Sequence, residues 1–335
     1  MKHPSEVLHA SGKAPVVLPV CDHYAGSEKL MQKSLERQAQ AGPVFDVTLD
    51  CEDGAAVGKE AEHAEMAARL AASDANRYGR VGVRVHDVNH PSFISDLEIL
   101  IGIAGHKLAY ITVPKVNSAN DALNAAESVE RIGMEMGLDR KIPVHVLIET
   151  HGALREVFRI AAHPAIECLS FGLMDFVSSH RGAIPAHALT AEGQFEHPLV
   201  ARAKLEIAAA CHAYGKVPSH NVVTELNAPE VIARAAQRAG REFGYTRMWS
   251  IHPSQIDPIV GALSPSAEDV EDAERTGVED APAGPVPAQR PQQARAVVVA
   301  QGVDAQSGEL RGLTDEQLRR GGRGHDPSVV PGAHS

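Results

Sequence analysis

The chain has 335 residues, 44% of them hydrophobic, and a formal charge of −11 from 43 acidic and 32 basic side chains. This composition predicts a globular α/β protein with enough apolar material for one large core or two smaller ones. The negative charge disfavours nonspecific binding to nucleic acid or to an anionic membrane, although a local basic pocket can still bind a small anion. We therefore expect small-molecule partners, with no nucleic acid and no membrane.

Cysteine usage and hydropathy predict the compartment. The four cysteines are dispersed without a Cys-x-x-Cys pair, which favours buried free thiols. No apolar run approaches the ~20 residues of a membrane span. Residues 1–15 lack the apolar core of a signal peptide. A cytoplasmic protein is expected.

Short β-rich runs alternate with helical stretches along most of the chain. Eight strands are expected, at Val16–Val20, Phe45–Leu49, Val81–Val85, Leu108–Val113, Pro143–Ile148, Ile166–Phe171, Val217–Ser219 and Arg247–Ile251. Helices are expected at Glu28–Gln40, Gly58–Arg77, Ser118–Met136, His197–Tyr214 and Ala228–Arg241. Such alternation gives parallel strands with right-handed crossovers. Eight units match the ~250 residues of a closed (β/α)8 TIM barrel better than a doubly wound sheet.

The composition changes after Ser264. Glu268–Asp280 is acidic, Ala281–Pro291 is rich in proline, and Ala294–Ala300 is a short apolar run. We therefore expect residues 1–263 to form the barrel and residues 264–335 to form a Pro-rich linker and carboxyl-terminal extension. A lid and an interface arm are alternative roles for this extension.

Polar side chains gather at the carboxyl ends of the expected strands. They are Cys21, Asp22, Asp50, Glu52, Asp53, Arg84, His86, Lys115, Glu149, Asp175, His220 and His252. In a barrel these ends converge on the face that carries the chemistry. Any one residue could face solvent or cap a helix, as Asp53 and Asp175 could. The joint pattern favours an active site.

Glu149 and Asp175 each follow an apolar run, in consecutive strand–helix units. Two carboxylates with room for water suit Mg²⁺, which prefers oxygen ligands. A metal held this way acts as a Lewis acid and orients the substrate. We therefore predict that Glu149 and Asp175 are metal ligands, with Glu149 also close to the substrate.

The remaining strand-end charges predict substrate binding and proton transfer. Arg84 offers a planar fork for a carboxylate or a developing enolate oxygen. Lys115 either binds substrate or pairs with Asp50 or Glu52. Like charge in the cluster of Asp50, Glu52 and Asp53 can raise a carboxyl pKa into a range useful for catalysis. Which of these three acts as the base stays open.

Other chemistries have little support. The dinucleotide and phosphate-loop fingerprints are absent from the strand-to-helix turns, and no Gly-x-Ser-x-Gly nucleophile motif occurs. The spacing of the 18 histidines matches neither a zinc protease helix nor a zinc finger. The one tryptophan, Trp249, lies inside an expected strand, which predicts barrel or interface packing.

Six segments together resemble the citrate lyase beta subunit family, within the wider group of aldolases and malyl-CoA or citramalyl-CoA lyases. They are Leu49–Ala55, Val83–Val85, Val113–Val116, Ile148–Gly152, Phe171–Asp175 and Ile251–Ile256, in family order over about residues 13 to 265. The resemblance implies an oligomeric TIM barrel, trimeric or hexameric. It also implies that Glu149 and Asp175 hold magnesium and that Arg84 contacts substrate. The implied activity is a carbon–carbon lyase that acts on a hydroxy-acyl thioester such as malyl-, citramalyl- or citryl-CoA.

The chain also departs from the family pattern. Lys13–Ala14 and Pro19–Asp22 stand where the family commonly has an Arg-Ser pair and a Pro-Gly-Asn turn, and His151 replaces an alanine. A changed first loop alters the usual contacts with the acyl carrier. Two alternatives to the lyase stay open. One is a malyl-thioester thioesterase that uses the same metal site to activate water, and the other, suggested by the changed loop, is a barrel that binds ligands without catalysis.

Overall fold

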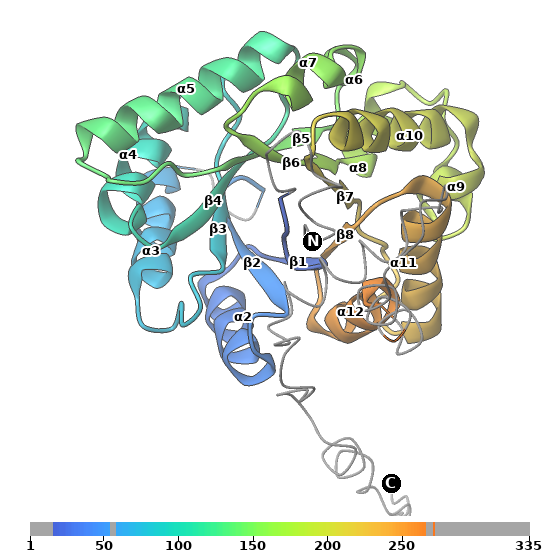
Figure 1. Ribbon diagram of the computed structural model, residues 1–335, viewed down its shortest axis with the longest axis horizontal. Helices are drawn as coiled ribbons and strands as arrows, with labels where there is room; N and C mark the ends of the chain where they lie inside the picture. The colour runs from blue at the N-terminus through green and yellow to red at the C-terminus, as the bar shows by residue number, and fades with distance from the viewer. Residues whose placement is uncertain (1–15, 54–57, 266–270, 272–335) are drawn as a thin grey trace, which may run out of the picture.

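The computed structural model describes residues 16–53, 58–265 and 271. Eight parallel strands close into a barrel in sequence order, with β1 paired to β8. The strands are β1 (Cys21–Ala25), β2 (Phe45–Asp50), β3 (Val81–Arg84), β4 (Leu108–Val113), β5 (Val144–Ile148), β6 (Ile166–Phe171), β7 (Val217–His220) and β8 (Arg247–Ser250). Figure 1 shows the helices arranged around the outside of this ring. The predicted TIM barrel is confirmed.

The helices follow the strands around the barrel. They are α2 (Glu28–Ala41), α3 (Glu60–Ala72), α4 (Phe93–Ala104), α5 (Ala119–Glu135), α6 (His151–Arg155), α7 (Val157–Ala162), α8 (Leu173–Ser179), α9 (Gly193–Glu196), α10 (Pro198–Ala213), α11 (Pro229–Phe243) and α12 (Ile256–Leu263), with 3-10 turns η1 (Ala186–Leu189) and η2 (Pro253–Gln255). Local chemistry sets several ends. The Ser118 side chain caps α5 by accepting from the Asp121 N–H, and α11 ends at Gly244 in the left-handed region.

The first strand differs from the prediction. The apolar run Val16–Val20 was expected to form it, but β1 is Cys21–Ala25, in register with Phe45–Leu49 of β2. Cys21 and Asp22 consequently lie within the strand and not at its carboxyl end. The prediction was wrong because Asp22 and His23 look unsuited to a buried strand, whereas each has a buried partner, Arg247 for Asp22 and Ser250 for His23.

The barrel interior has a charged layer. Arg247 is fully buried and pairs with Asp46 at 2.6 Å and with Asp22 at 3.1 Å. Asp22 also accepts hydrogen bonds from Thr48 at 2.7 Å and from Tyr110 at 3.0 Å. Because the buried charges are paired and hydrogen-bonded, the interior tolerates them. Removing one partner would leave an uncompensated charge.

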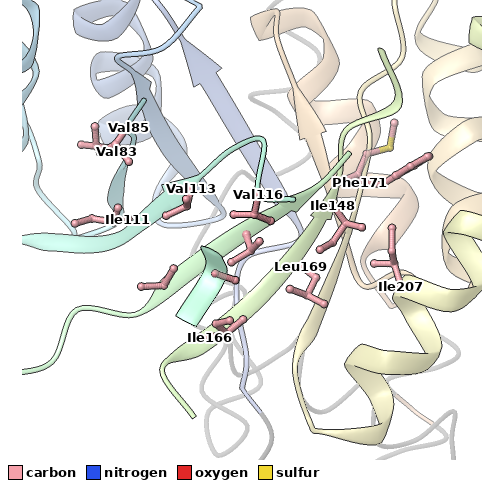
Figure 2. Close-up of a cluster of buried hydrophobic side chains, with 14 of the residues drawn as sticks. Val83, Val85, Ile111, Val113, Val116, Ile148, Ile166, Leu169, Phe171 and Ile207 are labelled. Atoms are coloured by element: carbon pink, nitrogen blue, oxygen red, sulfur yellow. The ribbon is translucent and has the colours of Figure 1, made fainter. Parts of the chain in front are cut away.

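The hydrophobic core fills the space between the strands and the surrounding helices. Figure 2 shows Val83, Ile111, Ile148 and Leu169 from neighbouring strands gathered with Ile207 of α10. All four cysteines are buried and free, as predicted. None of the described helices is long and apolar enough to cross a membrane. The predicted extension, residues 264–335, lies almost wholly outside the described residues, so its role stays a prediction.

Candidate active site

Arg84, the last residue of β3, lies among three carboxylates. Its Nε donates to Asp50 Oδ1 at 2.8 Å, and its Nη2 donates to Asp50 Oδ2 at 2.7 Å. Nη1 lies 3.0 Å from Glu52 Oε2, and Nη2 donates to Asp53 Oδ2 at 3.1 Å. Burial opposes the charge of Arg84, but these partners raise its pKa further above the ordinary value. The guanidinium is therefore a fixed cation at the mouth of the barrel.

Lys115 joins this group from the loop after β4. Its Nζ pairs with Glu52 and lies 3.7 Å from Asp53 Oδ1. Its backbone adopts a φ of 52°, in the left-handed region that a lysine seldom occupies. In this conformation its N–H donates to Glu149 Oε1 at 2.6 Å. The residue thus connects the acidic cluster to the predicted metal ligand, and we call Asp50, Glu52, Asp53, Arg84 and Lys115 the cation–carboxylate cluster.

Glu149 lies directly after β5, and its side chain is buried with 3% exposure. Thr150 begins the next helix, because its hydroxyl accepts from the Ala153 N–H. Burial raises the pKa of Glu149 to about 8, and the nearby charges of Asp175 and Glu52 contribute to the increase. The Lys115 N–H and the charge of Arg84 oppose this increase, but they do not offset the effect of burial on the ionised carboxylate.

Asp175 is exposed in the first turn of α8, close enough to Glu149 to affect its pKa. Among the described residues, no three His, Cys, Asp or Glu side chains converge as a complete metal cage. Two protein carboxylates instead leave coordination positions for water and substrate oxygens, which is typical of Mg²⁺ sites in proteins. A divalent cation would also neutralise the repulsion between Glu149 and Asp175. The residues present therefore fit the predicted metal.

Several predicted strand-end residues do not join the cluster. Asp22 lies in the charged layer, and His86 donates or accepts through Nδ1 with buried Asp96 of α4 at 2.7 Å. His220 contacts the fully buried Lys204 of α10. The His252 side chain accepts from the Ser254 N–H and caps η2. These polar side chains hydrogen-bond to neighbouring elements of the barrel. A position at a strand end was therefore not sufficient to identify a residue of the site.

An aromatic pair beside Arg84 was not among the predicted site residues. Tyr24 of β1 stacks on Trp249 of β8, with 4.5 Å between ring centres. The Arg84 guanidinium carbon lies 5.5 Å from the centre of the Tyr24 ring. The expected packing role of Trp249 within the barrel agrees with this contact. Tyr24 was not predicted as a strand residue, because the first strand was expected at Val16–Val20 and lies at Cys21–Ala25.

A closed parallel barrel with ionisable groups at the carboxyl ends of its strands defines a TIM-barrel enzyme. Residues 30–253 match the model of the HpcH/HpaI aldolase/citrate lyase family, and the chain belongs to this family. Membership confirms the resemblance and the lyase class predicted from the sequence.

Individual relatives agree with this assignment. An L-malyl-CoA/beta-methylmalyl-CoA lyase of Cereibacter sphaeroides is 28% identical over 242 residues, covering 68% of this chain and 74% of that protein. The crystal structure of a citrate lyase from Burkholderia xenovorans LB400 is 48% identical, with a TM-score of 0.79 and 98% of both chains covered. A Mycobacterium tuberculosis protein, in complex with magnesium, acetoacetate and coenzyme A, is 21% identical, with a TM-score of 0.63 and coverage of 86% and 99%. This last likeness shows the shared fold.

Proposed function

We propose that this chain is a magnesium-dependent carbon–carbon lyase that cleaves a hydroxy-acyl thioester into an acyl thioester and a keto acid or aldehyde acid. The observation that carries the proposal is Arg84 fixed by Asp50 next to a buried Glu149 with a raised pKa. The names of the relatives support the thioester, and the magnesium, acetoacetate and coenzyme A bound to the Mycobacterium tuberculosis neighbour support the ligand classes.

Arg84 would bind the oxyanion that develops in the reaction. Three of its five N–H groups, Nε and both on Nη2, donate to Asp50 and Asp53, whereas Nη1 lies 3.0 Å from Glu52 Oε2 without a hydrogen bond to it. Asp53 is the partner most easily replaced, because its side chain is 62% exposed. A substrate carboxylate or enolate oxygen can exchange with Asp53 while Asp50 keeps the guanidinium in place.

Glu52 is the best placed of the three acids to take the hydroxyl proton. Burial raises its pKa, and Asp53 adds to the increase, although Arg84 and Lys115 oppose it. Asp50 is less suited, because both of its oxygens accept from Arg84. Lys115 would then hold Glu52 in position and help to neutralise substrate charge. This assignment narrows the choice that the sequence left open.

Glu149 and Asp175 would hold the magnesium ion. When bound, the ion supplies Lewis-acid polarisation of the keto-acid oxygens. The chain's own contribution is to orient Glu149, whose Oε1 is fixed by the Lys115 N–H at 2.6 Å. The trimeric or hexameric assembly and the cytoplasmic location stay predictions.

The decisive experiment measures product release from malyl, citramalyl and citryl thioesters with magnesium, using a carbonyl trap and a thiol trap in parallel. The lyase releases a keto acid or aldehyde acid, and chelation of the metal or Glu149→Gln abolishes this product. Thiol without carbonyl product would show the thioesterase instead. Binding of the panel without any product would show the non-catalytic alternative.

A further inference from the structure

Two aromatic side chains lie in the barrel interior beside the cation–carboxylate cluster. Tyr24 and Trp249 stack with an angle of 18° between their planes, and each has only 8% exposure. Together with Leu147 they form a small apolar cluster that is separate from the main core. Their strands, β1 and β8, are neighbours in the closed barrel. Leu147 belongs to β5, the strand that Glu149 follows, so the pair packs across the barrel interior.

Strand alternation explains why these rings face inward. Side chains two residues apart lie on the same face of a strand. Asp22 and Tyr24 therefore share the inner face of β1, and Arg247 and Trp249 share the inner face of β8. Because Asp22 pairs with Arg247 inside the barrel at 3.1 Å, the two rings form the next layer toward the strand ends. That layer lies under Arg84.

An aromatic ring restrains Arg84 differently from a carboxylate. Asp50 and Asp53 accept from three of the five N–H donors of Arg84, and only the two donors on Nη1, beside Glu52, remain for a ligand. The Tyr24 ring contacts the guanidinium at 5.5 Å from its centre and takes no N–H donor. The contact does not involve Asp53, so exchange of Asp53 for a substrate oxygen would leave the ring against the guanidinium. The ring can therefore hold the cation without competing with substrate.

We propose that Tyr24, supported by Trp249, is a positioning residue that fixes the Arg84 guanidinium for the reacting oxygen. The contact with Arg84 is made by the ring. An aromatic side chain without the hydroxyl should therefore keep Arg84 in place as Tyr24 does. The catalytic part of this inference rests on the proposed lyase function. The position of the Arg84 guanidinium does not depend on the lyase function, and crystal structures can measure it separately.

The test compares Tyr24→Phe and Tyr24→Leu in the full chain, with crystal structures and kcat/KM as the two readouts. In Tyr24→Leu we expect a displaced or multiply placed Arg84 guanidinium and a loss in kcat/KM of about tenfold or more, from the size of a buried cation–π contact. In Tyr24→Phe we expect Arg84 in place and activity within about twofold of the parent, because the ring contact is kept. Met31→Ala, a buried change in α2, controls for general loss of stability and should leave Arg84 unmoved.

Each outcome decides between the alternatives. An unmoved Arg84 with full activity in Tyr24→Leu would overturn the proposal, and so would equal losses in the Phe and Leu variants. If Tyr24→Leu fails to fold, Trp249→Leu removes the supporting ring and should give the same displacement to a smaller extent. If the parent protein cleaves no thioester, the proposed function fails, while the crystal structures still decide the role of Tyr24.

Discussion

Gly172 approaches Glu149 so closely that a Cβ atom on residue 172 would lie 2.1 Å from Glu149 Oε2 and 2.5 Å from Glu149 Cβ. The glycine follows β6, and its N–H donates to the Ile148 carbonyl at 3.2 Å. The position of the Glu149 carboxylate therefore depends on the lack of a side chain at the end of the neighbouring strand, β6. Glycine is required here for close approach of the backbone.

Gly172→Ala should consequently weaken magnesium binding. The added methyl group forces Glu149 to move, because it would clash with the Cβ of Glu149 as well as with the carboxylate at the end of that side chain. We expect the magnesium affinity, measured by titration calorimetry, to fall at least about tenfold, since a displaced ligand and its supporting contacts typically cost that much. Gly261→Ala in α12 is the matched control, because an added Cβ there meets nothing within 4 Å. Equal affinity in both variants would show that Glu149 does not bind the metal.

Magnesium affinity should depend on pH through Glu149. Without metal its pKa is about 8, against an ordinary value of 4.5. Because only the ionised carboxylate binds the cation, affinity should rise as the pH increases toward 8 and level off above it. Glu149→Gln should bind weakly at every pH, and calorimetry in buffers of different ionisation enthalpy should detect proton release only in the parent. A flat pH profile would contradict the raised pKa.

The same shift affects the stability of the metal-free chain. A carboxyl group whose folded pKa lies above its unfolded pKa stabilises the fold fully below about 4.5, and this contribution is lost as the pH rises through about 8. The free energy of unfolding of the parent relative to Glu149→Gln should therefore decline across this range. Denaturant titrations at several pH values, with chelator present, measure the difference. Saturating magnesium should remove the decline.

Arg84→Lys should lose most activity despite keeping the charge. The bidentate contact with Asp50 needs the planar fork of arginine. We expect kcat/KM to fall by about 10²-fold or more, the usual cost of losing a donor to a developing oxyanion. Arg131→Lys on the exposed surface of α5, where the side chain pairs with Glu135, is the control and should retain activity. Activity near that of the parent would remove Arg84 from the proposed role.

Lys204 should matter for folding and not for the reaction. The fully buried Nζ of Lys204 donates to Gln194 Oε1 at 2.9 Å and to Asn221 Oδ1 at 2.8 Å, and it contacts His220. Replacing it by methionine leaves these buried groups without their shared donor. We expect Lys204→Met to lower the free energy of unfolding by about 2–4 kcal/mol in denaturant titrations. Lys141→Met, at a side chain with 79% exposure, should change it by less than about 0.5 kcal/mol.

Local patterns were sufficient for most of the barrel. Seven of the eight strands lie where their apolar runs predicted, including β4 at Leu108–Val113 and β6 at Ile166–Phe171, as expected. Helix α4 (Phe93–Ala104) was not among the predicted helices, because its nearly continuous apolar residues hide the helical period. Strand β1 was misplaced because its inward face carries Asp22, whose partners come from other strands.

The sequence by itself determined the alternation of strands and helices, the barrel that follows from it, and the strand-end positions of Arg84, Glu149 and Asp175. These depend on the spacing of apolar residues and on turn chemistry over a few neighbouring positions. Only the tertiary structure decided that Tyr24 lies against Arg84, that Gly172 makes room for Glu149, and that His86 turns away to Asp96. Such contacts join residues far apart in the chain, and the raised pKa of Glu149 comes from burial that exists only after the barrel has closed.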